Sequence, residues 1–324
     1  MTPPVRIGIM GCADIARRRM LPAMAALDDI EVVAVASRTG PTAEELAGVY
    51  SCRPVTGYDG LLALPEVDAV YIPLPLALHA RWVEAALRAG KHVLVEKPLT
   101  AAPRETRRLL DLASSRGLVL MENMMFVHHH RHDAVRRLLE RGAIGELRSF
   151  HADFTIPRLP DQDIRYQPEL GGGALWDVGL YPVRAAMYFL GDDLEVVGAV
   201  LGASPGRRVD TSGAVLLRRW DGVTAQLTFG LEHAYASRYQ LCGSTGRIQV
   251  DRAFAPPADH IPVIRVDSGT DSREIPLTPD DQARNSLRAF TAAVRTRKAD
   301  DAVVHSCIRQ ADLLALVSEG GSWK

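Results

Sequence analysis

The segment VRIGIMGCADIA, Val5–Ala16, decides the fold of this chain. A short apolar run ends at Gly11, and a helical pattern follows at once. Such a strand–turn–helix unit aims backbone N–H groups and the positive end of a helix at a pyrophosphate. The glycine pattern is incomplete, because Ala13 and Ala16 hold its second and third positions. The alternative is a turn with a purely structural role. The position of this turn at the start of a βαβ unit favours dinucleotide binding.

Short apolar runs alternate with helical patterns along the first 122 residues. Nearly continuous apolar strands are typical of a parallel sheet that helices cover on both faces. The strands are predicted at Val5–Met10, Ile30–Ala36, Ala69–Ile72, His92–Val95 and Val119–Met121, and the helices at Ile15–Leu27, Thr42–Tyr50, Leu78–Ala89 and Pro103–Arg116. This alternation predicts a doubly wound α/β domain of the Rossmann type over residues 1–124.

After residue 124 the pattern changes to that of an α+β domain, which we place at residues 125–324. Several segments alternate apolar and polar residues, as half-buried strands of an antiparallel sheet do, and Gly243–Gly246 is a hairpin turn. The strands are predicted at Leu147–Phe154, Glu195–Gly202, Ala214–Arg219, Thr224–Gly230, Ser237–Cys242 and Arg247–Val250, and the helices at Arg131–Arg141, Ala174–Leu190, Gln282–Arg297 and Val303–Ser318. We therefore expect a large, mostly antiparallel open sheet, with the last helices able to pack on the first domain.

Bulk properties exclude several classes of protein. A chain of 324 residues exceeds one ordinary core and favours two domains. A net charge of -1 gives no general basic field for nucleic acid or an anionic membrane. No apolar run is long enough to span a bilayer, and the N-terminus lacks a signal-peptide pattern. Four cysteines without CxxC spacing indicate reduced thiols, so we expect a cytoplasmic protein.

The end of the second predicted strand, Ala36–Thr39, bears on the choice of cofactor. NAD enzymes place a carboxylate about 20 residues after the glycine turn to bind the ribose, whereas an Arg accommodates the 2′-phosphate of NADP. No acidic residue lies in this segment, and Ser37 and Arg38 are suited to a phosphate. A solvated surface arginine is the alternative. We predict NADPH as the cofactor.

Two further motifs carry candidate reactive groups. Glu96-Lys97-Pro98 ends a buried strand, at the sheet edge where open α/β sheets collect ligands. A Lys there can stabilise developing negative charge on a carbonyl oxygen, and an ordinary strand-end Lys is the alternative. Gly171-Gly172-Gly173 precedes a helical segment on which Asp177 and Tyr181, four residues apart, share one face. In the functional interpretation, Asp177 and Tyr181 clamp a substrate and donate a proton. The alternative is a surface Asp and a core Tyr with a structural role.

The run His128-His129-His130-Arg131-His132 invites a metal interpretation. Three adjacent histidines do not share a face of a helix or strand, and no Cys or carboxylate stands at ligand spacing. We therefore predict no metal. We expect instead a polar loop that lines the cleft between the domains, with at most one of these histidines touching the substrate.

Taken in order, these motifs resemble the family of glucose–fructose oxidoreductase, inositol dehydrogenase and MocA, over nearly the whole chain. The resemblance implies a Rossmann domain followed by an α+β domain, with the cofactor at the carboxyl ends of the first domain's strands and the substrate between the domains. It makes Lys97 the active-site lysine and Asp177 the substrate-side acid. It also implies a homodimer or homotetramer that forms through the second domain's sheet.

Tyr181 departs from the commonest pattern of the family, which has His at this position. Together with the segment Met121–His129, Tyr181 resembles a smaller branch, the sugar 3-ketoreductases of deoxysugar biosynthesis, which act on dTDP-linked 3,4-diketo-2,6-dideoxyhexoses. For this chain the resemblance implies reduction of the sugar C3 ketone with NADPH. Tyr181 and Lys97 would share the catalysis, and the sequence leaves open which of them donates the proton.

The full set of predicted site residues follows from these motifs and this resemblance. The catalytic residues are predicted to be Lys97 and Tyr181. Cofactor contacts are predicted at Gly11, Cys12, Ala13, Asp14, Ile15, Ser37, Arg38, Thr39, Pro73, Leu74, His79, Glu96 and Lys97. Substrate contacts are predicted at Lys97, Asn123, Phe126, His128, Arg158, Arg165, Trp176, Asp177 and Tyr181. Either Arg158 or Arg165 is expected to meet the substrate's diphosphate, with two solvated loop arginines as the alternative.

Two other functions fit the same sequence. The first is oxidation of a free sugar or polyol such as an inositol, which more often uses NAD, and Arg38 argues against it. The second is a non-catalytic NADP-binding sensor on the same fold. A sensor predicts a damaged Lys97 motif, whereas the motif here is intact.

Overall fold

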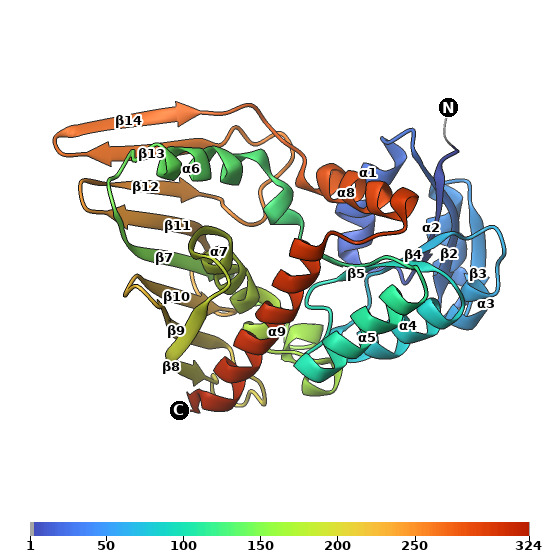
Figure 1. Cartoon of the computed structure of the whole chain (residues 1–324). Helices are drawn as coiled ribbons and strands as arrows, with labels where there is room; N and C mark the ends of the chain where they lie inside the picture. The colour runs from blue at the N-terminus through green and yellow to red at the C-terminus, as the bar shows by residue number, and fades with distance from the viewer. Residues whose placement is uncertain (1–2, 324) are drawn as a thin grey trace. The chain divides into compact units, whose positions relative to one another are not determined.

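The computed structural model describes residues 3–323, and the chain divides into two compact units (Figure 1). The first unit comprises Met1–Met125 and Ala283–Ile308, and the second comprises Phe126–Gln282 and Arg309–Lys324. Within the described residues no helix has both the length and the apolar character needed to cross a membrane.

The first unit is built on a six-stranded sheet in which every pair of neighbours is parallel. The strand order is β3-β2-β1-β4-β5-β6. The strands are β1 (Val5–Met10), β2 (Ile30–Ser37), β3 (Arg53–Thr56), β4 (Ala69–Ile72), β5 (His92–Glu96) and β6 (Leu120–Asn123). The predicted doubly wound domain is thus confirmed, and β3 is added to it. β3 was not predicted, because this short edge strand is largely exposed and has no apolar run.

Helices cover both faces of this sheet, as the apolar strands require. They are η1 (Ala16–Met20), α1 (Leu21–Ala25), α2 (Gly40–Val49), α3 (Tyr58–Leu62), α4 (Leu76–Arg88), α5 (Pro103–Ser115) and α8 (Gln282–Thr296). Leu287 and Phe290 of α8 lie in one core layer with Ile7 and Ile9 of β1. Trp82 and Leu109, from α4 and α5, lie in the layer on the other face. A helix distant in sequence therefore completes the first core.

The second unit carries a nine-stranded sheet with the order β14-β13-β12-β11-β7-β10-β9-β8-β15. Its strands are β7 (Leu147–Thr155), β8 (Leu194–Gly202), β9 (Ser212–Arg219), β10 (Thr224–Gly230), β11 (Ala236–Gly243), β12 (Gly246–Asp251), β13 (Val263–Ser268), β14 (Asp271–Pro276) and β15 (Ser322–Trp323). All neighbours are antiparallel except β7 with β10 and β8 with β15. The predicted open, mostly antiparallel sheet is confirmed. The outer hairpin of β13 and β14 was not predicted, since β14 is mostly exposed and charged.

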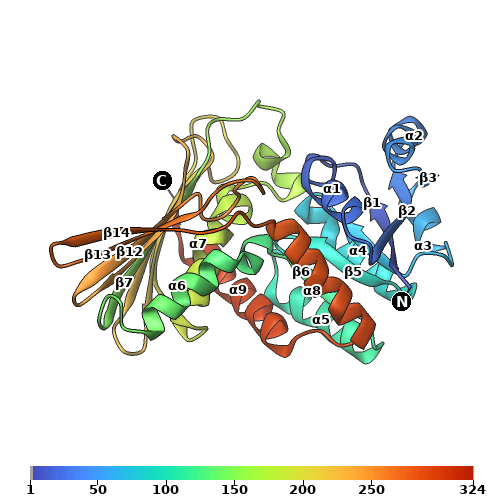
Figure 2. The same ribbon diagram turned by 90° about the horizontal axis from the view of Figure 1, so that it is seen from above.

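Helices of the second unit lie on one face of its sheet, which Figure 2 views nearly edge-on. They are α6 (His130–Glu140) and α7 (Leu180–Leu190), with the later part of α9 (Asp301–Gly320). Short helical turns precede them, namely η2 (Met125–His128), η3 (Ile164–Tyr166), η4 (Pro168–Leu170) and η5 (Leu175–Gly179). Val200 and Leu216 are exposed on strands β8 and β9, whereas Val215 and Leu217 are buried. The alternation leaves apolar side chains on the face opposite the helices.

Truncating Phe290 tests whether α8 belongs to the core of the first unit. We expect Phe290→Ala to lower the free energy of unfolding by ~3–5 kcal/mol, because the fully buried ring leaves a cavity. Arg288→Ala, on the exposed side of α8, is the control and should change stability by less than about 0.5 kcal/mol. Denaturant unfolding followed by circular dichroism measures both. Equal effects of the two substitutions would contradict this packing.

Candidate active site

The turn after β1 has the features that a pyrophosphate requires. Gly11 has φ +114°, and a Cβ at this position would press against Leu74. Its N–H donates to the carbonyl of Ala36 at 2.9 Å, which joins β1 to the end of β2. Cys12, Ala13 and Ile15 remain partly accessible, and Asp14 is exposed. The helix that follows starts with the π-helical turn η1, so the predicted helix Ile15–Leu27 is not one regular α-helix. The accessible backbone of this turn fits a dinucleotide.

The end of β2 presents a cation without a counterion. Ser37 is buried, whereas Arg38 and Thr39 are exposed. Within residues 3–323 Arg38 has no hydrogen-bond or ion-pair partner. The hydroxyl of Thr39 donates to that of Thr42 at 2.8 Å. An exposed guanidinium with no carboxylate beside it fits the 2′-phosphate of NADP and does not suit the ribose diol of NAD.

A buried carboxyl group lies directly before Lys97. Glu96 accepts hydrogen bonds from the hydroxyl of Tyr71 and the amide of Asn123, each at 2.7 Å. The hydroxyl of Ser286 in turn donates to Asn123 at 2.8 Å. Burial raises the pKa of Glu96, against the effect of these donors. The network joins the ends of β4, β5 and β6 to α8 and so fixes the backbone from which the half-buried Lys97 extends.

His79 supports the same edge of the sheet. Its ring nitrogens face the carbonyl oxygens of Pro98 and Leu74, at 2.8 and 2.7 Å. The side chain is 1% exposed, and burial lowers its pKa although both carbonyls favour the protonated ring. His79 therefore ties the turn that contains Pro73 and Leu74 to the segment after Lys97. The predicted cofactor contacts of His79 and Glu96 stay predictions.

The triple glycine is explained by two close approaches of backbone and side chain. A Cβ at Gly172 would collide with the carbonyl of Arg165, and one at Gly173 with the carboxylate of Asp210. Gly173, with φ +128°, donates its N–H to the carbonyl of Arg165 at 2.9 Å. Asp210 accepts from the N–H of Leu175 at 2.7 Å and caps the helical segment that follows. Sequence reasoning missed Asp210, because nothing marks an isolated Asp 35 residues away from the N–H that it caps.

The helix with Asp177 and Tyr181 is not one regular α-helix, contrary to the prediction for Ala174–Leu190. Leu175–Gly179 forms the π-helical turn η5, and α7 begins at Leu180. The wider turn changes the rotation between Asp177 and Tyr181, so the face-sharing argument for an α-helix does not apply across this junction. Trp176 and Asp177 are partly accessible in η5.

Asp177 is engaged with an arginine from the connection before the glycines. Arg165 donates its Nε–H to Asp177 at 2.6 Å and forms an ion pair with Asp163 at 3.1 Å. Arg158 pairs with Asp161 at 3.0 Å on the surface. Both arginines, one of which was expected to meet a diphosphate, thus have carboxylate partners within this unit. Whether either of them contacts a substrate stays a prediction, and Arg165 has a structural role in orienting Asp177.

Aromatic side chains surround the ring of Tyr181. Its centroid lies 5.0 Å from that of Phe154, and 5.8 Å from those of Phe126 and Phe254. Phe126 and Phe254 are fully buried. The packing fixes the direction of the phenol, which remains partly accessible. Only Phe126 of these three was expected near the substrate, because single Phe residues on distant strands carry no sequence signal.

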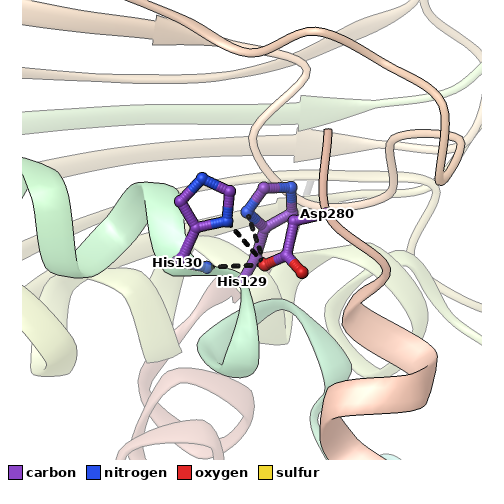
Figure 3. Close-up of side chains that lie close together, drawn as sticks. All are labelled: His129, His130 and Asp280. Carbon is purple, nitrogen blue, oxygen red and sulfur yellow. Dashed lines mark hydrogen bonds and ion pairs between the residues drawn. The ribbon is translucent and has the colours of Figure 1, made fainter. Parts of the chain in front are cut away.

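The histidine run is not a polar loop. Its residues form the end of η2 and the start of α6, and His129 and His132 are buried. Figure 3 shows the rings of His129 and His130 facing Asp280. Asp280 Oδ2 lies 2.8 Å from His130 Nδ1 and 3.5 Å from His129 Nδ1. This carboxylate was not predicted, because it lies 150 residues beyond His130.

These three residues could hold a metal ion, since one ligand atom from each lies within 4.8 Å of the others. The observed contacts fit a helix cap better. Asp280 accepts the N–H of His130 at 2.9 Å at the start of α6, and His129 Nδ1 accepts the N–H of Arg131 at 3.2 Å. The buried guanidinium of Arg131 follows directly and repels a cation. The absence of a resident metal stays a prediction.

The buried Asp210 predicts a pH dependence of stability. Burial raises its pKa from 3.8 to about 6, so between these values the folded state binds more protons than the unfolded state. Asp210 therefore destabilises the fold progressively as the pH rises from about 4 to 6. We expect Asp210→Asn to gain up to about 3 kcal/mol relative to the unsubstituted protein between pH 4 and pH 7. Urea unfolding at both values measures it, and a stability difference that is independent of pH would contradict the burial argument.

Comparison with known proteins identifies the family. Residues 5–124 match the model described as "Oxidoreductase family, NAD-binding Rossmann fold", and residues 132–249 match the "GFO/IDH/MocA C-terminal domain". A dTDP-3,4-didehydro-2,6-dideoxy-alpha-D-glucose 3-reductase from Actinomadura kijaniata is 50% identical over 98% of this chain and 96% of its own length. The enzyme of the same name from Streptomyces violaceoruber is 51% identical over 97% of this chain and 95% of its own.

A solved structure matches the whole fold. The crystal structure of a 3-ketoreductase from Actinomadura kijaniata, in complex with NADP and TDP-benzene, has a TM-score of 0.97 and 49% identity. The match covers 99% of this chain and 98% of the other. The two domain models together span most of residues 5–249, and the relatives and this structure match nearly the full length. The chain belongs to the GFO/IDH/MocA family of oxidoreductases.

Proposed function

We propose that this protein reduces the C3 ketone of a dTDP-linked 3,4-diketo-2,6-dideoxyhexose, with NADPH as the reductant. Relatives with this reductase name share about half of their residues with it over nearly their whole length. One observation supports the assignment of Lys97 and Tyr181 to the reaction. Variants of the solved 3-ketoreductase replace one Tyr and one Lys that are 84 residues apart, which is the spacing of Lys97 and Tyr181.

The first unit supplies the cofactor site in this proposal. The turn at Gly11 receives the pyrophosphate, and Arg38 pairs with the 2′-phosphate. NADPH, when bound, supplies the hydride for the C3 carbon. The carboxyl ends of β4, β5 and β6, which the buried Glu96 joins, hold Lys97 toward the nicotinamide end of the site.

In this proposal, the side chains of Lys97 and Tyr181 supply the proton for the C3 oxygen. The ammonium of Lys97 donates a hydrogen bond to that oxygen and stabilises the negative charge that develops on it. The phenol of Tyr181, which its three Phe neighbours hold in one direction, is the second donor. Either group can deliver the proton, and the other then orients the oxygen. Asp177, which Arg165 positions, is left to contact the sugar hydroxyls.

Oxidation of a free sugar is the second candidate. An NADP-dependent D-xylose 1-dehydrogenase from Haloferax volcanii is 36% identical over 89% of this chain. Its lower identity places it behind the 3-reductases. The same cofactor preference serves both functions, so the discrimination rests on the substrate.

The proposed assembly is a cytoplasmic homodimer or homotetramer that forms through the sheet of the second unit. The apolar side chains of Val200 and Leu216 are exposed on the face of that sheet opposite its helices. Exposed apolar surface of this kind favours association with another copy.

Turnover of an enzymatically generated dTDP-3,4-diketo-2,6-dideoxyhexose tests the function. We expect rapid NADPH oxidation with a C3-reduced product, and at least a tenfold loss of kcat/KM (about 1.4 kcal/mol) in Tyr181→Phe or Lys97→Met. Tyr188→Phe, which removes a phenol on the same helix that bonds Asp133, is the control and should retain activity. Oxidation of D-xylose with NADP+ but no reduction of the diketo sugar would select the second candidate. Full activity of both variants would refute the assignment of the donors.

Arg38 provides a separate test of the cofactor site. We expect Arg38→Ala to raise the KM for NADPH by roughly tenfold to a hundredfold, because a charge-assisted hydrogen bond to the phosphate is lost. The KM for NADH should stay within about twofold, since NADH has no 2′-phosphate. Arg116→Ala, which removes an exposed arginine after α5, is the matched control. Steady-state kinetics with both cofactors measures the difference, and an equal rise for both would argue against this contact.

A further inference from the structure

Buried polar atoms without a partner gather at one place in the second unit. Within residues 3–323 the buried side-chain atoms that lack any hydrogen bond are His129 Nε2, Arg131 Nε, Arg131 Nη2, His132 Nε2 and Gln282 Oε1. Arg131 and His132 are 0% exposed. Buried polar groups in folded proteins are almost always paired, so a concentration of unpaired ones points to a partner that the chain does not supply.

The contacts that these residues do make show that they form one cluster. Arg131 Nη1 donates to the carbonyl of Arg252 at 2.8 Å, and Gln282 Nε2 donates to that of Phe254 at 3.1 Å. The rings of His129 and His132 have centroids 6.2 Å apart. Arg131 and Gln282 thus hold the same short stretch after β12, with both histidines beside Arg131.

Donors outnumber acceptors among the unpaired atoms. His129 Nδ1 accepts the N–H of Arg131, which leaves the ring proton on Nε2 of the neutral imidazole. Burial lowers the pKa of His129 to about 3, so its ring is neutral. Burial lowers the pKa of Arg131 only to about 10, so the guanidinium stays charged at neutral pH. The unpaired atoms of Arg131 and His129 therefore carry four N–H groups and one positive charge, whereas Gln282 Oε1 is the one unpaired oxygen among the buried side chains of residues 3–323.

The carboxylate of Asp280, whose charge raises the pKa of Arg131 against the effect of burial, is hydrogen-bonded to His130. Asp280 Oδ2 accepts from the ring and the N–H of His130, at 2.8 and 2.9 Å. A buried charge without a hydrogen-bonded counterion is strongly unfavourable. Water can accept from these N–H groups, but it brings no negative charge to offset the buried guanidinium.

We propose that this cluster binds a small inorganic anion of the size of chloride, held by Nε and Nη2 of Arg131 and by Nε2 of His129. The adjacent Nε and Nη2 atoms form the fork that Arg uses for anions. The anion supplies the missing negative charge and acceptors together.

The anion site lies behind the proposed proton donor. The ring of His132 meets that of Phe126 edge-on, with centroids 5.4 Å apart, and Phe126 in turn contacts the ring of Tyr181. An anion that fixes Arg131 also steadies His132, the next residue of α6, and through it the aromatic support of Tyr181. The binding itself does not depend on the proposed function.

Bromide tests the site, because it replaces chloride and scatters anomalously. Crystals of the unsubstituted protein grown without halide and soaked in sodium bromide should show an anomalous peak at hydrogen-bonding distance from Arg131 Nε and Nη2. In solution, each tenfold rise in chloride above its dissociation constant should raise Tm by roughly 2–3 °C, at constant ionic strength set with gluconate.

Variants separate this site from general salt effects. Arg131→Gln should abolish the chloride dependence of Tm, whereas Arg137→Gln, an exposed arginine of the same helix, should retain it. If Arg131→Gln fails to fold, the bromide soak of the unsubstituted protein still decides. Ordered water without bromide at these nitrogens, or a chloride dependence that survives in Arg131→Gln, would overturn the proposal.

Discussion

A buried carboxyl group must receive hydrogen bonds, and this constraint shapes both parts of the proposed site. Glu96 accepts hydrogen bonds from the side chains of Tyr71 and Asn123, and these bonds fix the ends of three strands around Lys97. Asp210 accepts a hydrogen bond from the N–H of Leu175, and the position of its carboxylate leaves no room for a side chain at Gly173. Each candidate donor is thus presented by backbone that a buried, hydrogen-bonded carboxyl group holds in place.

Arg131 poses the same problem with the opposite charge. Backbone carbonyls can supply acceptors to a guanidinium, but they supply no negative charge, and only one of them bonds Arg131. Asp280 is close enough to cap α6 yet is committed to His130. The three buried ionisable groups therefore differ in outcome. Glu96 and Asp210 accept hydrogen bonds from protein donors, whereas Arg131 takes its counterion, the proposed anion, from solution.

The sequence predicted what depends on local pattern. Apolar runs located β1, β2, β4, β5 and β6, because strands that are buried on both faces must be apolar throughout. β3 and β14 were not predicted, since exposed edge strands need no apolar run. The motifs with Lys97 and Tyr181 were visible because their glycine and proline neighbours are local. Asp210, Asp280 and Phe254 were not, because the contacts that give them meaning come from distant parts of the chain.

The two π-helical turns, η1 and η5, show why helical periodicity misled the argument about Tyr181. η1 follows the glycine turn at Gly11, and η5 follows the triple glycine. π-Helical turns are rare, occur mostly as single turns within helices and are frequent at functional sites. Asp177 lies within η5, and Tyr181 follows its end. The extra residue in the turn re-aims Asp177 relative to α7, so Arg165 can engage the acid while the phenol keeps its place among Phe126, Phe154 and Phe254.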